Sequence, residues 1–155
     1  MEASMQSSPQ LALQTQSTIS PSDRQWAASA HFLALLLALM TAWMVGVAGI
    51  VGAGIIYLIK RDDSSFVAEH AREAINFNLS MLLYSVAAVA MGVLLAGATV
   101  LTLGLGLIVT APAGLLLLVA AAGIAVMWLV CSLVAGFKAW NGEHYRYPLT
   151  LRWLG

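Results

Sequence analysis

The sequence has very little formal charge: Asp, Glu, Lys and Arg together make up 9% of its 155 residues. These residues fall in three short clusters, and the stretches 25–59 and 74–137 contain none of them. A soluble helix or strand of that length needs charged side chains on its water-exposed face, so the two stretches exclude an ordinary soluble fold. Their length and composition predict segments that are embedded in lipid.

Cysteine is almost absent, and so is net charge. Cys131 is the single cysteine, which excludes an intrachain disulfide and leaves a redox site without a partner. The 7 basic and 7 acidic residues cancel, so no field of one sign attracts nucleic acid. Residues 1–22 lack the basic and apolar parts of a signal peptide and are rich in Ser and Gln, which predicts a disordered N-terminal tail.

Hydrophobic residues make up 61% of the chain, and their arrangement predicts an all-α integral membrane domain over residues 23–155. A single helix over 25–59 would be ~52 Å long against a hydrocarbon layer of ~30 Å, so this stretch is predicted to cross twice. Helices are expected at about 23–44 and 47–59. The break between them is placed in a glycine cluster, because glycine weakens helices and permits turns; its members are Gly46, Gly49, Gly52 and Gly54.

The second stretch holds either two long helices or three short ones. Pro112 and the glycines near it favour a break, with helices at about 66–96 and 113–138. Whether 97–114 forms a loop or an additional membrane segment stays open. Two crossings in each stretch place every Lys and Arg on one side, and the positive-inside rule puts that side in the cytoplasm. The sequence thus predicts four transmembrane helices in two hairpins, in the inner (plasma) membrane, with both termini cytoplasmic.

A polar stripe on the third predicted helix is one candidate functional feature. Its members recur at helical spacing and are Glu69, Glu73, Asn76 and Ser80, with His70 beside them. Polar groups inside a bilayer need partners, because leaving them unpaired is costly. The stripe is therefore a polar pathway, a lock between helices, or a set of groups satisfied locally, for instance by a pair between Glu69 and Arg72.

The titratable residues form no recognisable metal or catalytic motif. Of the three histidines, only His70 shares a helical face with a carboxylate, that of Glu73, so no metal or other cofactor is expected. No serine in the predicted membrane segments has both a histidine and a carboxylate near it in sequence, so no enzymatic activity is expected. Small residues four apart in 42–53 predict close helix packing, either within the chain or between copies of it.

Two charged clusters form a candidate cytoplasmic motif. The first contains Lys60, Arg61, Asp62 and Asp63, and the second contains Tyr145, Arg146, Tyr147 and Pro148. Because proline ends a helix and aromatic residues favour the interface, the second cluster is expected to lie on the cytoplasmic membrane surface. A pair between Arg146 and Asp62 or Asp63 would then join the two clusters.

The segments 59–77 and 141–149, in this order and between four apolar helices, resemble a bacterial family of small membrane proteins of unknown function. That family is grouped with the chloroplast inner-envelope protein-import component often called Tic-twenty. The resemblance implies a four-helix polytopic fold and, by analogy, a part in protein translocation. It implies no catalytic residues.

These features predict a non-enzymatic polytopic membrane protein, with an oligomeric channel or a protein-translocation component as the leading function. The alternatives are a small-solute transporter that uses the polar stripe and a membrane-embedded enzyme, which a bound metal or lipid-like substrate near His70 would favour. The expected partners are the lipid bilayer and either further copies of the chain or other membrane proteins, with no nucleic acid.

Overall fold

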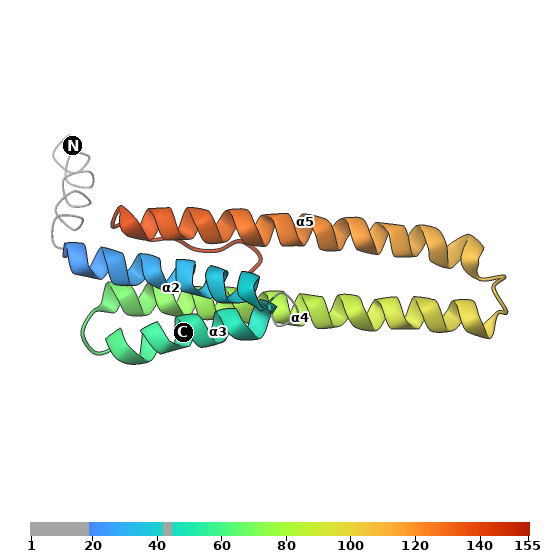
Figure 1. Cartoon of the computed structure of the whole chain (residues 1–155), viewed down its shortest axis with the longest axis horizontal. Helices are drawn as coiled ribbons and strands as arrows, with labels where there is room; N and C mark the ends of the chain where they lie inside the picture. Colours follow the sequence, from blue (N-terminus) through green and yellow to red (C-terminus); the bar gives the residue numbers. More distant parts are fainter. Residues whose placement is uncertain (1–18, 42–44) are drawn as a thin grey trace, which may run out of the picture.

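The computed structural model describes residues 19–41 and 45–155 (Figure 1). Over these residues the chain is helical, without strands, and its elements are α2 (Pro21–Met40), α3 (Val45–Lys60), α4 (Ser65–Leu101) and α5 (Leu107–Trp140). The all-α prediction is confirmed. Of the tail predicted at 1–22, residues 1–18 lie outside the described part, and α2 already includes residues 21 and 22.

Serine caps begin two of the helices. The Ser20 hydroxyl accepts a hydrogen bond from the Asp23 backbone N–H at 3.0 Å, and Pro21 occupies the first turn of α2, where its missing N–H is not needed. The Ser64 hydroxyl does the same for the Val67 N–H at 3.4 Å, at the start of α4. Both caps lie at the charged end of the molecule, so they fix where the apolar helices begin.

The glycine cluster does not break the first hydrophobic stretch, contrary to the sequence prediction. α2 ends at Met40, and the four glycines of 46–54 are all helical residues of α3. They serve packing instead: a Cβ built on Gly46 would lie 2.6 Å from Leu82 Cβ, and one built on Gly52 would lie 3.0 Å from Leu37 Cδ1. Small residues here let α3 approach α4 and α2 closely.

The segment 97–114 is neither a long loop nor a further crossing. α4 continues to Leu101 and α5 begins at Leu107, so a short turn joins them. Leu103 and Gly104 have φ values of 52° and 89° in this turn, and the hydroxyls of Thr99 and Thr110 are 2.6 Å apart beside it. The break predicted between 97 and 114 is therefore confirmed as this turn. Pro112 lies inside α5, so the start predicted for the last helix, at about residue 113, is too late.

The two hairpins differ greatly in length, as Figure 1 shows. α4 and α5 form a long hairpin, and α2 and α3 cover only the half of it that lies away from its turn. The buried core is in this four-helix half, where small residues such as Ala27, Ala30 and Ala71 meet Val67 and Phe66. The other half consists of α4 and α5 alone.

Only α4 and α5, among the described helices, are long and apolar enough to span a membrane. Their most apolar windows are almost entirely exposed rather than buried in the protein, so this surface requires a lipid-like environment. α3 has 16 residues, and α2 carries Asp23 and Arg24 in its first turns. The expectation of four transmembrane helices is therefore wrong, because the first hydrophobic stretch is divided into helices that are too short or too polar.

Candidate functional site

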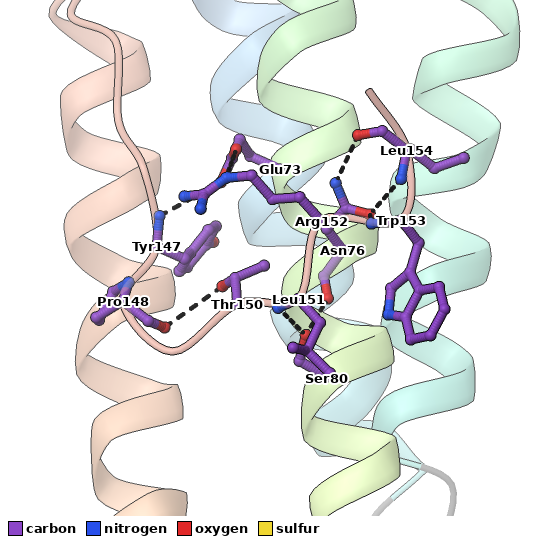
Figure 2. A network of polar contacts seen from close by, with 10 residues as sticks. All are labelled: Glu73, Asn76, Ser80, Tyr147, Pro148, Thr150, Leu151, Arg152, Trp153 and Leu154. Carbon is purple, nitrogen blue, oxygen red and sulfur yellow. Dashed lines mark hydrogen bonds and ion pairs between the residues drawn. The ribbon is translucent and has the colours of Figure 1, made fainter.

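The C-terminal segment 145–154, here called the strap, lies along the polar face of α4 (Figure 2). It crosses from beside α5 to α4 and turns at Leu149, whose φ of 55° is unusual for a residue with a side chain. The sequence led us to expect this segment on the membrane surface. In the structure its backbone groups instead find hydrogen-bonding side chains on the polar stripe.

Asn76 makes the densest set of these contacts. Its Oδ1 accepts hydrogen bonds from the backbone N–H groups of Trp153 and Leu154, at 3.1 and 3.0 Å. Its Nδ2 donates to the Leu154 carbonyl at 3.0 Å. An amide side chain can donate and accept at once, so a single residue that is 1% exposed satisfies three backbone groups of the strap.

The polar stripe extends one helical turn beyond Ser80, where the sequence prediction ended, and includes Tyr84. The Ser80 hydroxyl accepts a hydrogen bond from the Leu151 N–H at 2.9 Å, and the Tyr84 hydroxyl donates to the Leu149 carbonyl at 2.7 Å. Tyr84 was not among the predicted site residues. Its spacing of four residues from Ser80 was the available signal, because residues four apart share a helical face.

Ionic contacts hold the strap at the charged end of α4. The Glu73 carboxylate lies 3.1 Å from Arg152 Nε and accepts the Tyr147 N–H at 3.4 Å, and Glu73 is buried. Arg72 donates to the Gly155 carbonyl. Glu69 pairs with His144 Nδ1 at 3.1 Å, rather than with Arg72. The stripe is thus occupied by the chain's own C-terminal segment.

The two clusters of the predicted cytoplasmic motif are not joined to each other. Lys60 pairs with Asp63 at 3.1 Å and Arg61 with Asp62 at 3.4 Å, so the first cluster is satisfied locally. Arg146 is exposed and lines a cavity of about 300 Å³ together with Glu69, Glu73 and the other strap arginine. The expected pair between Arg146 and Asp62 or Asp63 does not form among the described residues.

A buried chain of three rings ties the strap to two helices. The Tyr147 hydroxyl lies 2.9 Å from His31 Nδ1, and His31 Nε2 lies 2.9 Å from His70 Nδ1. Tyr147 also stacks on Phe77 with 3.9 Å between ring centroids. Burial raises the pKa of the Tyr147 hydroxyl far above its usual range, so this group stays protonated. The strap is therefore anchored to α2 and α4 through one aromatic side chain.

Tyr145 and Pro148 have smaller parts in the strap. The Tyr145 ring packs edge-on against Tyr147 at 5.2 Å, and burial, followed by a hydrogen bond with Cys131, raises the pKa of its hydroxyl to about 12. Pro148 is exposed at the strap turn, where its carbonyl accepts the Thr150 hydroxyl at 3.4 Å. In the described ranges 19–41 and 45–155, no three His, Cys, Asp or Glu residues gather in a way that could hold a metal ion.

Replacing Tyr147 with phenylalanine is expected to lower the free energy of unfolding by about 1–3 kcal/mol, because it leaves a nitrogen of buried His31 without its hydrogen bond while keeping the ring. Thermal unfolding in detergent would measure this loss. Tyr57→Phe is the matched control, since its hydroxyl has no hydrogen-bond partner in the described part of the chain. Equal melting temperatures for the two variants would contradict the anchoring role.

Comparison with known proteins gives one family. The model of the magnetosome magnetite crystal formation protein family, MamF/MmsF, matches residues 22–154, which include all four helices and the strap. This match overturns the Tic-twenty-like resemblance suggested by the two charged clusters. No curated protein and no solved structure matches the chain.

Proposed function

This chain belongs to the MamF/MmsF family, and we propose that it acts in magnetite crystal formation as a non-enzymatic membrane protein with a structural role. The observation that carries the structural role is the occupied polar stripe. The groups that a conduit would offer to a solute, on Asn76, Ser80 and Tyr84, are bonded to the strap. The geometry favours a rigid body whose charged end is presented at one membrane surface.

The transport functions that the sequence suggested receive less support. A channel or a solute transporter would need polar groups facing a continuous opening, and the cavity between α4 and α5 near Met81, Ala88 and Trp128 is lined mainly by apolar side chains. A part in protein translocation rested on the Tic-twenty-like resemblance and is withdrawn with it. Reconstituted in liposomes, the chain is expected to produce no ion conductance.

The proposed topology has α4 and α5 crossing the membrane as one hairpin. Both ends of the hairpin then lie on one side, and the charged clusters 60–73 and 138–152 lie on that side too. The positive-inside rule supports a cytoplasmic location for this side and for both termini. Besides lipid, we propose further copies of the chain as a partner, because large apolar side chains of the α4–α5 hairpin, such as Val89 and Leu116, are exposed where a second membrane helix would pack.

The test is complementation in magnetosome-forming cells that lack their own member of the family. Expression of the wild-type chain is expected to restore crystal size, measured by electron microscopy. A variant with a released strap, Asn76→Leu, is expected to restore it less, at equal membrane abundance. Crystals of normal size in the recipient cells without the chain would contradict the proposed function, and so would ion conductance by the chain in liposomes.

A further inference from the structure

The lengths of the helices set how many of them cross a bilayer. α3 has 16 residues, or ~24 Å at the helical rise, and the charge-free part of α2, 25–40, is equally long. Both fall short of a hydrocarbon layer of ~30 Å. α4 and α5, with 37 and 34 residues, are ~55 and ~51 Å long. The longer hairpin has length to spare, whereas the shorter one has too little.

The packing fixes how far the shorter hairpin reaches beside the longer one. Gly46, near the start of α3, contacts Leu82, and Ala38, near the end of α2, packs in the cluster that contains Met81 and Trp128. Leu82 lies near the middle of α4, ~26 Å from its start and ~29 Å from its end. Beyond this level, α4 and α5 continue without α2 or α3 (Figure 1).

The polar groups fix the level of the bilayer along α4. The contacts of Glu69 with His144 and of Glu73 with Arg152 lie at the start of α4, and the Asn76 contacts follow at once. With Glu69, Glu73 and Asn76 in the headgroup layer, ~30 Å of hydrocarbon covers about 20 residues of α4, from near Phe77 to near Gly97. The strap then enters the hydrocarbon as far as Tyr84, where the hydroxyls of Ser80 and Tyr84 bond its Leu151 N–H and Leu149 carbonyl. The hydroxyls of Thr99, Thr102 and Thr110 then lie at the opposite interface. This placement leaves no apolar helix exposed to water at the hairpin turn.

We infer that the α2–α3 hairpin enters only one leaflet, which makes the chain a wedge that concentrates in bilayers curved outward at its charged end. At the level of that leaflet there are four helices and the strap, and at the other level only α4 and α5. Two helices, each at least ~10 Å across, correspond to a difference in area of about 160 Å².

The narrow half is slender in its side chains as well. Gly97 and Gly123 are exposed there, and a Cβ built on either would meet nothing within 4 Å. Lipids around a body of this shape fill the space beside the narrow end, so bending the bilayer lowers the mismatch between the two leaflets. The lipid surface that fits the chain is therefore the convex outer leaflet of a small vesicle, with the charged end outward.

Cysteine accessibility tests the depth of the hairpin. In a Cys131→Ala background, single cysteines are introduced at Met40, which is 74% exposed, and at Leu103, which is 94% exposed. Asp62→Cys marks the charged end. Impermeant maleimide is expected to label Asp62→Cys from one face and Leu103→Cys from the other, and to leave Met40→Cys unlabelled from both. Labelling of Met40→Cys from the same face as Leu103→Cys would overturn the inference.

Sorting between vesicles tests the wedge itself. Chain labelled with dye at Asp62→Cys is reconstituted in vesicles of mixed size with the charged end outward, and protein density per lipid is measured for each vesicle. Density in vesicles of about 30 nm is expected to exceed that in vesicles of about 200 nm by about two- to threefold. Equal density across sizes would overturn the inference, even if Met40→Cys proved unreactive.

Paired variants test whether the taper, the difference in width between the four-helix half and the two-helix half, causes the sorting. Gly97→Leu with Gly123→Leu adds side chains to the narrow half and is expected to reduce the enrichment in small vesicles. Gly54→Leu is the matched control: a Cβ at Gly54 also meets nothing within 4 Å, but it lies on α3 in the wide half. Enrichment that falls equally in both would overturn the assignment of the curvature preference to the taper.

Discussion

Substituting leucine for Asn76 is expected to release the strap and to lower the free energy of unfolding by about 1.5–4.5 kcal/mol. The change leaves the N–H groups of Trp153 and Leu154 and the Leu154 carbonyl without their partner. Each hydrogen bond contributes about 0.5–1.5 kcal/mol net, because the freed backbone groups belong to exposed residues and can bond to water in the headgroup layer. Chemical unfolding in detergent would give the loss in stability.

Limited proteolysis separates release of the strap from a general loss of stability. Trypsin can cleave the strap after the exposed Arg146 and after Arg152, which is paired with Glu73. Cleavage after Arg152 is expected to accelerate strongly in the Asn76 variant while the helices stay intact. Ser85→Ala is the control on the same helix, because the Ser85 hydroxyl donates only to the Met81 carbonyl within α4. A protected strap and wild-type stability in Asn76→Leu would show that the stripe is not what holds the strap.

Gly49→Leu is expected to destabilise the chain by about 3 kcal/mol or more, because it overfills the contact between α3 and α4. A Cβ built on Gly49 lies 2.2 Å from Asn78 Oδ1. Asn78 has little freedom to move away, since its Nδ2 donates to the Ala74 carbonyl at 2.9 Å and its Oδ1 lies 3.4 Å from Trp128 Nε1. Thermal and chemical unfolding in detergent would measure the effect.

The same substitution at Gly54 is expected to change the free energy of unfolding in the opposite direction. Gly54 is in the same helix, and a Cβ there meets nothing within 4 Å. Leucine forms helices better than glycine, so Gly54→Leu should stabilise the chain by roughly 0.5–1 kcal/mol. If both variants lost the same stability, helix propensity or the membrane environment, and not the close approach to Asn78, would explain the result.

The sequence by itself determined that the chain is helical and apolar, and roughly where its helices lie. Two stretches without charge require segments whose backbone groups are satisfied internally, and in lipid a helix meets that need. The helix predicted at 66–96 corresponds to α4 at Ser65–Leu101, because Ser64 caps its start. The periodicity of Glu73, Asn76 and Ser80 also identified a face of α4 that needed partners.

The first glycine cluster and the start of the last helix were misplaced, because the effect of glycine and proline on a helix depends on the residues packed around them. Gly46 and Gly49 could allow either a turn or a close helix contact, and only the presence of Leu82 and Asn78 opposite them selects the contact. Pro112 could end a helix or lie near the start of one. Its place follows from the turn at 102–106, where Leu103 and Gly104 adopt left-handed backbone conformations.

Only the tertiary structure decided what occupies the polar face and how deep each hairpin reaches. Asn76 and Leu154 are far apart in sequence, and helical periodicity gives the direction of a side chain but not the segment that comes to lie on it. Likewise, helix length sets whether α3 can cross a bilayer, whereas its level against α4 is set by the contact of Gly46 with Leu82. Such long-range contacts depend on the packing of the whole chain, which local sequence patterns do not encode.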